Sequence, residues 1–242
     1  MSAIRTLIIA TSHDILGDTK VKTGAWLEEI SIPYYAFRDA GADIVISSPR
    51  GGRVPLDPKS QSVILSNYGT KKFMKDDEAM SLMSASRKLE EINANDFDLV
   101  LVTGGHGAMW DLADNAILNL LLESFYSQGK VIGALCHGVA GLMSLKNVKG
   151  EALIKGKKLT CFSNSEEGSV GLCATVPFLL ESRLHSLGGI YSKQENYTSH
   201  VVADGNIITG QNSASSIVVV EKMLTRFKSN RITQGIGHII QE

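Results

Sequence analysis

Short apolar segments alternate along this chain with stretches whose apolar residues recur every three or four positions. Strand-like segments lie at residues 4–11, 42–48, 97–103 and 130–135. Stretches of helical length lie between them, at residues 24–40, 76–91 and 108–128. Such alternation is typical of parallel strands joined by crossover helices. The sequence therefore predicts an α/β protein, and the uniformly apolar segment 97–103 is expected at the centre of its sheet.

The second half of the chain continues this pattern with shorter elements. Helices are expected at residues 137–145, 177–187 and 213–227, a short strand at 159–162, and a hairpin at 201–209 that turns at Asp204-Gly205. Pro33 is expected to kink or interrupt the helix at 24–40. We predict one domain over residues 1–228, with an irregular, Pro- and Gly-rich insertion at about 49–75 and a C-terminal tail at 229–242.

Charge and apolar content exclude several classes of protein. The 242 residues carry 24 basic and 25 acidic side chains, so the chain lacks the positive charge that nucleic-acid binding requires. No apolar run reaches the roughly 18 residues that a membrane span needs, and no signal peptide precedes the first strand. The three cysteines form no CxxC pair, which argues against a disulfide framework and a cysteine zinc site. A cytoplasmic protein with reduced thiols is expected.

The motif Leu135-Cys136-His137-Gly138 joins a predicted strand directly to the helix that follows it. A reactive residue at such a sharp turn is typical of a nucleophile elbow. The dipole and free amide groups of the helix N-terminus favour the thiolate form of a cysteine placed there. Cys136 is therefore the predicted nucleophile, and His137 is the candidate base. The nearby acidic turn with Glu166 and Glu167 could supply a carboxylate that orients the histidine.

A second turn, Gly104-Gly105-His106-Gly107, follows the apolar segment 97–103. Its glycines allow a ligand to approach the backbone, and the N–H groups of Gly104 and Gly105 could form an oxyanion hole beside His106. The turn is not a GxGxxG motif and no Walker lysine follows it, so a nucleotide site is weakly supported. We predict that it binds the substrate.

Each of these features also has a purely structural interpretation. A cysteine at the end of a buried strand is often an inert small apolar residue. The two histidines could simply be hydrogen-bonded in a crowded loop, and the glutamate pairs at 28–29 and 166–167 could be solvated charges. Cys161 and Cys173 have no neighbouring base in the sequence, so they are interpreted as structural or surface thiols.

Four motifs together resemble the ThiJ/PfpI superfamily, also called class I glutamine amidotransferase-like, and most closely its heat-shock chaperone and glyoxalase III branch. They are Ala134-Leu-Cys-His-Gly, Thr103-Gly-Gly-His-Gly, Lys22-Thr-Gly-Ala-Trp-Leu-Glu-Glu and Thr209-Gly-Gln-Asn-Ser-Ala-Ser-Ser. The resemblance implies a flavodoxin-like three-layer sandwich whose small insertion caps the active site. It also implies that Cys136 is the nucleophile and His137 the base, that Glu29 contacts the thiol, with Glu28 as the alternative, and that Glu167 orients the histidine, with Glu166 as the alternative.

The resemblance further implies a glutathione-independent glyoxalase III, which converts the small aldehyde methylglyoxal to lactate without a metal or other cofactor. Dimers are common in this family, so a homodimer is expected. One departure is Ser213, where relatives commonly have proline. Other members have been described as holding chaperones, deglycases, peptidases or amidases, and these functions, together with a redox sensor, remain alternatives. A glutaminase is disfavoured because the chain contains no His-x-Glu motif.

Overall fold

The computed structural model describes residues 3–62, 64, 65 and 67–239, and seven of its strands form one sheet. The order across the sheet is β3 (Arg87–Lys88), β2 (Ala42–Ser48), β1 (Ile4–Ile9), β4 (Leu99–Val102), β5 (Val131–Leu135), β9 (Ile207–Gly210) and β8 (Val201–Asp204). All neighbours are parallel except β8 and β9, which form the predicted hairpin. The sequence prediction of a mostly parallel α/β sheet with β4 at its centre is confirmed.

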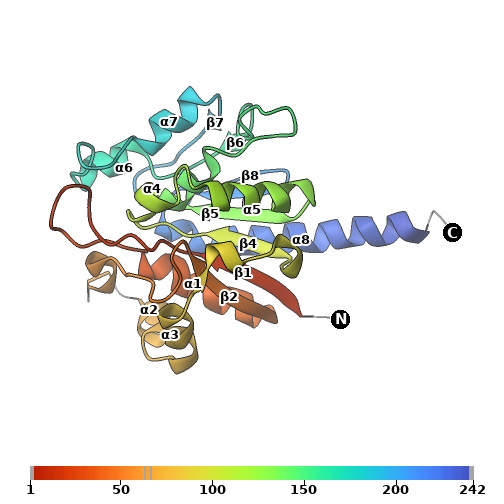
Figure 1. The fold of residues 1–242 in the computed structure, drawn as a ribbon, viewed down its shortest axis with the longest axis horizontal. Coiled ribbons are helices and arrows are strands. Elements are labelled where there is room, and N and C mark those ends of the chain that lie inside the picture. The colour runs from red at the N-terminus through yellow and green to blue at the C-terminus, as the bar shows by residue number, and fades with distance from the viewer. Residues whose placement is uncertain (1–2, 63, 66, 240–242) are drawn as a thin grey trace.

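Helices cover both faces of this sheet, as Figure 1 shows. One face packs against α1 (Leu27–Asp39) and α8 (Ser216–Ile239), and Leu99 and Leu101 of β4 point into that core. The other face packs against α4 (Ala108–Asp111) and α5 (Ala116–Ser127), and Val100 and Val102 point there. Because β4 is apolar on both faces, successive residues contribute to two separate cores. The result is the expected three-layer sandwich.

Several helices have different bounds from those that periodicity predicts. Helix α1 begins at Leu27 because the residues before it are extended, with Ala25 bridged to Leu56. It is not interrupted at Pro33, which is buried inside it, because tertiary packing outweighs the local preference. The expected helix at 108–128 is divided into α4 and α5, since Asp114 adopts a positive φ of 54° and Asn115 caps α5.

The expected helix at 76–91 is also divided. Helix α3 (Asp77–Ser84) ends before β3, which adds to the edge of the sheet beside β2. Short 3-10 helices follow at η2 (Leu89–Glu91) and η3 (Ala94–Asp96). The insertion at about 49–75 is not wholly irregular, because it contains η1 (Pro58–Gln61) and α2 (Tyr68–Phe73). Asn67 begins α2 with a capping box, a local signal that the sequence prediction overlooked.

The remaining elements lie around the carboxyl end of the sheet and in the C-terminal half. They are η4 (Cys136–Leu142), β6 (Lys158–Leu159), α6 (Asn164–Ser169), α7 (Leu180–Ser186), β7 (Ile190–Tyr191) and η5 (Ser213–Ser215). Strands β6 and β7 form a separate two-stranded sheet. Helix α8 continues to Ile239, past the predicted end near Phe227, because the segment contains no proline. The last three residues of the predicted tail lie outside the described residues.

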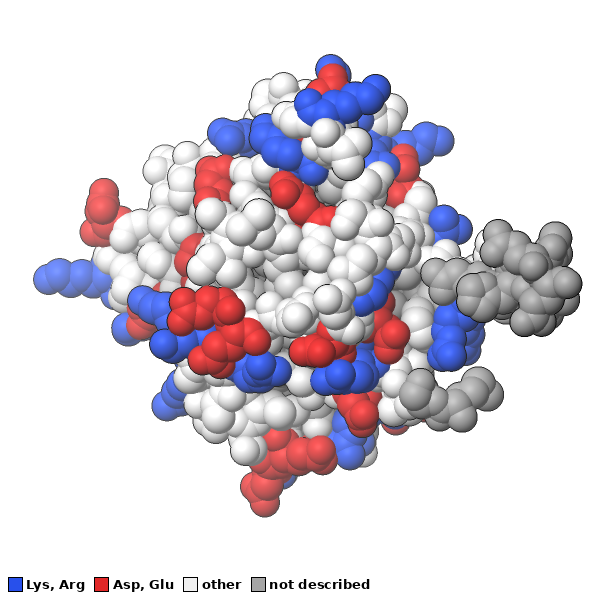
Figure 2. Space-filling model, turned by 45° about the vertical axis from the view of Figure 1, so that its right-hand side comes forward, with Lys and Arg blue, Asp and Glu red and all other residues white. Residues whose placement is uncertain are grey.

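The outer surface carries charges of both signs. On the face shown in Figure 2, acidic and basic side chains lie next to one another. Within the described part of the chain, no helix combines the length and the apolar character needed to cross a membrane.

Candidate active site

Cys136 lies at a strained turn between β5 and η4. Its φ of 54° falls in the left-handed region, which costs a residue with a side chain roughly 1–2 kcal/mol. The strain points to a functional constraint, because a glycine would adopt this backbone without it. The side chain is almost enclosed, with 5% of the residue exposed. The local geometry is that of the nucleophile elbow that the sequence predicts.

The two neighbours in sequence also face each other in space. His137 Nδ1 lies 3.3 Å from Cys136 Sγ, and His137 Nε2 lies 2.7 Å from Glu167 Oε2. Glu167 is supplied by α6, which follows β6 along the chain. A cysteine, a histidine and a carboxylate therefore form one hydrogen-bonded chain, and Glu167 rather than Glu166 belongs to it.

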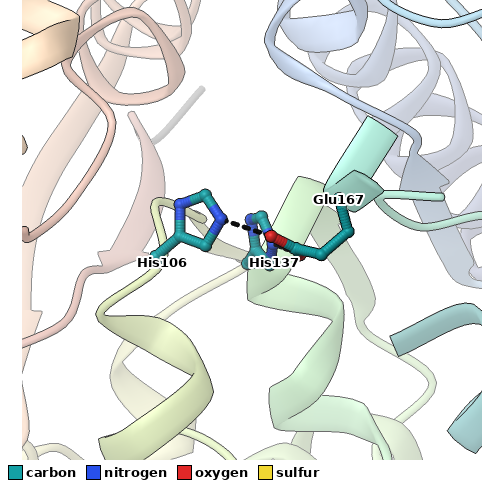
Figure 3. Close-up of side chains that lie close together, drawn as sticks. All are labelled: His106, His137 and Glu167. Atoms are coloured by element: carbon teal, nitrogen blue, oxygen red, sulfur yellow. Dashed lines mark hydrogen bonds and ion pairs between the residues drawn. The ribbon is translucent and has the colours of Figure 1, made fainter. Parts of the chain in front are cut away.

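His106 contacts the other oxygen of the same carboxylate, as Figure 3 shows. Its Nε2 lies 2.8 Å from Glu167 Oε1, and its ring centroid lies 4.1 Å from that of His137. Sequence reasoning placed His106 near the substrate but missed this contact. The available signal was topological, because β4 and β5 are neighbours and both turns follow their carboxyl ends.

Glu29 approaches the thiol from helix α1. Its carboxyl hydrogen-bonds with Cys136, and its Oε2 accepts the Gly104 N–H at 2.7 Å. Gly104 was expected to donate to an oxyanion, but its N–H is already used by Glu29. Glu28 faces the insertion instead, where its Oε1 accepts from Asn67 at 2.7 Å. Of the two glutamates, Glu29 therefore belongs to the site.

Gly104 is required by the closeness of this packing. A Cβ atom there would lie 2.7 Å from Glu29 Oε2 and 2.8 Å from the backbone nitrogen of His137. Both distances are shorter than van der Waals contact allows, so any larger residue would displace Glu29 or the elbow. The N–H of Gly105, in contrast to that of Gly104, donates no hydrogen bond to any of the described residues.

The Lys22-Thr23-Gly24 motif holds the start of α1 against this turn. The Thr23 hydroxyl donates to buried Asp57 at 2.8 Å, which ties the segment to the insertion. The Gly24 carbonyl accepts from Gly107 at 3.4 Å, and the Trp26 N–H donates to the Gly104 carbonyl at 3.2 Å. The motif therefore fixes the first turn of α1, and with it Glu29, relative to the end of β4.

Burial is the main cause that determines the protonation states of Cys136 and Glu29. Burial raises the pKa of Glu29 from its ordinary value of 4.5 to about 8, even though the Gly104 N–H favours the carboxylate. Burial, together with the carboxylates of Glu29 and Glu166, raises the pKa of the Cys136 thiol. The expected lowering by the helix N-terminus is thus outweighed. At neutral pH both groups hold their protons, and the thiol requires a base when it reacts.

His137 and Glu167 provide such a base. Burial, assisted by His106, lowers the pKa of His137 to about 4, so its imidazole is neutral. Burial disfavours ionised Glu167, but the hydrogen bonds from His106 and His137 prevail and lower its pKa to about 2. An ionised carboxylate can only accept hydrogen bonds, so both histidines carry their proton on Nε2. His137 Nδ1 is then a free acceptor facing the thiol.

Glu166 has a different role from its neighbour. It is fully buried, and its carboxylate accepts hydrogen bonds from five donors at 2.8–3.0 Å. The donors are the Ser163 N–H and hydroxyl, the Tyr197 N–H, and the side-chain amides of Gln211 and Asn212. This explains the Gln211-Asn212 motif, whose amides fasten α6 to the end of β9.

Replacing Glu166 by glutamine is expected to destabilise the protein by about 2–4 kcal/mol, because an amide nitrogen would face several buried donors. Urea unfolding followed by circular dichroism measures this loss, which should appear as a lower midpoint concentration of urea. Glu195, which is exposed, provides the control, and Glu195→Gln should leave the midpoint unchanged. An unchanged midpoint in Glu166→Gln would show that the carboxylate does not hold α6 in place.

Three residues of the site could also hold a metal ion. Among the described residues, one group of potential ligands is found, and it consists of buried His106, His137 and Glu167 with ligand atoms within 4.8 Å of one another. The same atoms are joined in the hydrogen bonds described above. Cys161 is buried elsewhere and Cys173 is exposed, so neither thiol adds to this group.

The parallel sheet and the strained turn that places Cys136 beside His137 and Glu167 define an α/β protein with a buried cysteine–histidine–carboxylate site. The model of the DJ-1/PfpI family matches residues 21–226, and the chain belongs to this family. The family expected from the sequence motifs is therefore confirmed.

Individual relatives extend the similarity over nearly the whole chain. Glyoxalase 3 of Candida albicans is 28% identical over 237 residues, which cover 94% of this chain and 100% of the relative. The glutathione-independent glyoxalase HSP31 of Saccharomyces cerevisiae is 26% identical, and the match covers 89% of this chain and 94% of the relative. Among solved structures, the Rapid Encystment Protein 24 kDa of Francisella tularensis is 39% identical with a TM-score of 0.89, and covers 93% of this chain and 99% of its own. Glyoxalase III from Candida albicans has a TM-score of 0.85 at 27% identity, and the match covers 93% of this chain and 97% of that structure.

Proposed function

We propose that this protein is a glutathione-independent glyoxalase that converts methylglyoxal to lactate. The observation that carries the proposal is the placement of the Cys136 thiol between two proton-transfer groups, the neutral His137 imidazole and the protonated Glu29 carboxyl. The names of relatives that match this chain over most of its length support the same activity. The chemistry needs a nucleophile and two groups that move protons between adjacent carbons, and all three meet here.

The first step is addition of the thiol to the aldehyde. His137 Nδ1 takes the thiol proton while Cys136 Sγ bonds to the aldehyde carbon, which gives a hemithioacetal. The Gly105 N–H is available to stabilise the negative charge that develops on the carbonyl oxygen. The nearby ionised Glu167 stabilises the imidazolium that forms on His137.

The second step moves a proton between the two adjacent carbons. The carbon bonded to sulfur loses its proton to a base, which gives an enediol, and the neighbouring carbon is then protonated. Glu29 and His137 both interact with Cys136 and serve as the two groups of this shuttle. The product is a lactoyl thioester on Cys136, and its hydrolysis releases lactate. Each step is an addition or a proton transfer, so the proposal requires no metal or redox cofactor.

The direct test is to supply methylglyoxal to the purified protein without glutathione and to measure lactate enzymatically. We expect catalytic turnover, and we expect added glutathione to leave the rate unchanged because the protein's own thiol forms the adduct. Prior alkylation of the protein should stop the reaction. If correctly folded protein with a reduced Cys136 thiol forms no lactate from methylglyoxal, the proposal is wrong. Cleavage of a casein substrate by the same preparation would favour a peptidase instead.

A further inference from the structure

We propose that His106 is a second catalytic base, which activates the water that hydrolyses the Cys136 thioester. The inference rests on the proposed glyoxalase function and assigns its last step to a residue other than His137. It follows from the way in which two imidazoles share one carboxylate in Figure 3.

The two histidines are bound to Glu167 in equivalent ways. Each presents Nε2 to a different carboxylate oxygen, at 2.8 Å for His106 and 2.7 Å for His137. With a proton on Nε2, each ring has Nδ1 as its second nitrogen. In His137 that atom faces the Cys136 sulfur at 3.3 Å. In His106 it points away from Glu167, and no hydrogen bond to it occurs within the described residues. The carboxylate thus orients two bases.

The positions of the two rings suit different steps of one reaction. His137 is 1% exposed and is enclosed between Cys136, Glu167 and Phe162, whose ring centroid lies 4.4 Å away. His106 is 7% exposed, so water can reach its edge. The two ring centroids are 4.1 Å apart, which keeps His106 beside the atoms that surround the sulfur. His137 is therefore placed to serve the thiol, and His106 is placed to serve incoming water.

Glu29 is a poor candidate for the same task. It is 1% exposed, its carboxyl is engaged with the Gly104 N–H and the Cys136 thiol, and at neutral pH it carries a proton. A group that already holds a proton cannot accept one from water. His106 is the more exposed imidazole of the group, and its Nδ1 has no hydrogen-bond partner among the described residues.

The hydrolytic step balances with His106 as the base. His106 Nδ1 takes a proton from water as the water oxygen bonds to the thioester carbon. The tetrahedral intermediate then collapses, the carbon–sulfur bond breaks, and its electron pair remains on Cys136. The new lactic acid gives its proton to that thiolate and leaves as lactate. His106 releases the remaining proton to solvent, which accounts for the one proton formed with each lactate ion.

The test uses His106→Asn and, to preserve ring packing against His137 and Phe162, His106→Phe. Methylglyoxal is added to each full-length protein, the reaction is quenched, and thioester is read as lactohydroxamate formed with hydroxylamine. We expect lactate turnover to fall by about 10²-fold or more while close to one thioester per protein accumulates. Hydroxylamine is added only after methylglyoxal has been removed, because it condenses with the aldehyde itself, and it should then release the accumulated acyl group as lactohydroxamate. The exposed His185 supplies the control, and His185→Asn should behave as wild type.

Other outcomes would overturn the inference. If both His106 variants form lactate at the wild-type rate, His106 is not the base. If turnover falls and no thioester accumulates, His106 only positions Glu167 for the first half of the reaction. Failure of the proposed function is distinguishable, because in that case the wild-type protein itself would form neither thioester nor lactate.

Discussion

Replacing Cys136 by alanine is expected to abolish the formation of lactate from methylglyoxal, with a loss of about 10³-fold or more. Every step of the proposed reaction takes place on the sulfur, and no other thiol lies beside His137 and Glu29. Cys161 is buried away from the site, and Cys173 is exposed. The measurement is lactate produced under saturating methylglyoxal without glutathione, compared between wild type and variant in parallel.

Cys173→Ala is the matched control, because it removes an exposed thiol and leaves the elbow intact. It should retain wild-type turnover. The Cys136 variant should also remain folded, since alanine fits the space and keeps the backbone at the same φ. Thermal unfolding of both variants checks this point. If Cys136→Ala retained turnover, a cysteine-based mechanism would be untenable.

Replacing Glu29 by glutamine is expected to make the protein less active and, at alkaline pH, more stable. Glutamine can still accept the Gly104 N–H, so the packing is retained, but it cannot take and return a proton. Loss of one acid–base group typically lowers turnover by about 10²–10⁴-fold. The two effects have separate causes, and each has its own measurement.

The stability effect depends on pH in a defined direction. The folded protein holds the Glu29 proton up to a pKa of about 8, whereas the unfolded chain releases it near 4.5. The contribution of Glu29 to stability should therefore be greatest below pH 4.5, decrease as the pH rises through this interval, and level off above about pH 8. The interval corresponds to a loss on the order of 5 kcal/mol from this one group. Glu29→Gln should remove that part of the pH dependence.

Urea unfolding at about pH 5 and about pH 9 measures the difference, and linkage fixes its sign. Glu28→Gln is the control, because Glu28 is half-buried and hydrogen-bonded to Asn67 outside the site. It should leave both turnover and the pH dependence close to wild type. A Glu29→Gln protein with an unchanged pH dependence would show that Glu29 is ionised in the folded state at neutral pH.

The parts of the fold that could be predicted are those governed by burial on both sides. The segment around β4 is apolar throughout, which only a central strand of a covered sheet allows, and the structure places it there. The ends of helices were less predictable because they depend on contacts distant in sequence. Ala25 is held extended by Leu56, and Arg87 is drawn to the sheet edge beside Ser47. Periodicity carries no information about such partners.

The site shows a similar division. The position of Cys136 at a strand end was sufficient to identify it as a candidate. The sequence alone did not allow a choice between neighbouring glutamates, because the two members of each pair are adjacent in the same element. The structure separates them by their partners, with Glu167 on the histidines and Glu166 on Gln211 and Asn212. The protonated state of Cys136 and Glu29 was also hidden, since burial determines it and burial is a property of the assembled fold.

The fastening of α6 to the end of β9 has a consequence for how the protein becomes active during its synthesis. Strand β9 also pairs directly with β5, the strand that carries Cys136. A nascent chain that ends before Ile207 therefore contains Cys136, His106 and His137, yet β5 is still an edge strand and Glu166 lacks its amide partners. Glu167 is then not held in place. The thiol gains its base only when the ribosome has delivered the segment that closes the sheet, so reactivity toward aldehydes is withheld from incomplete chains.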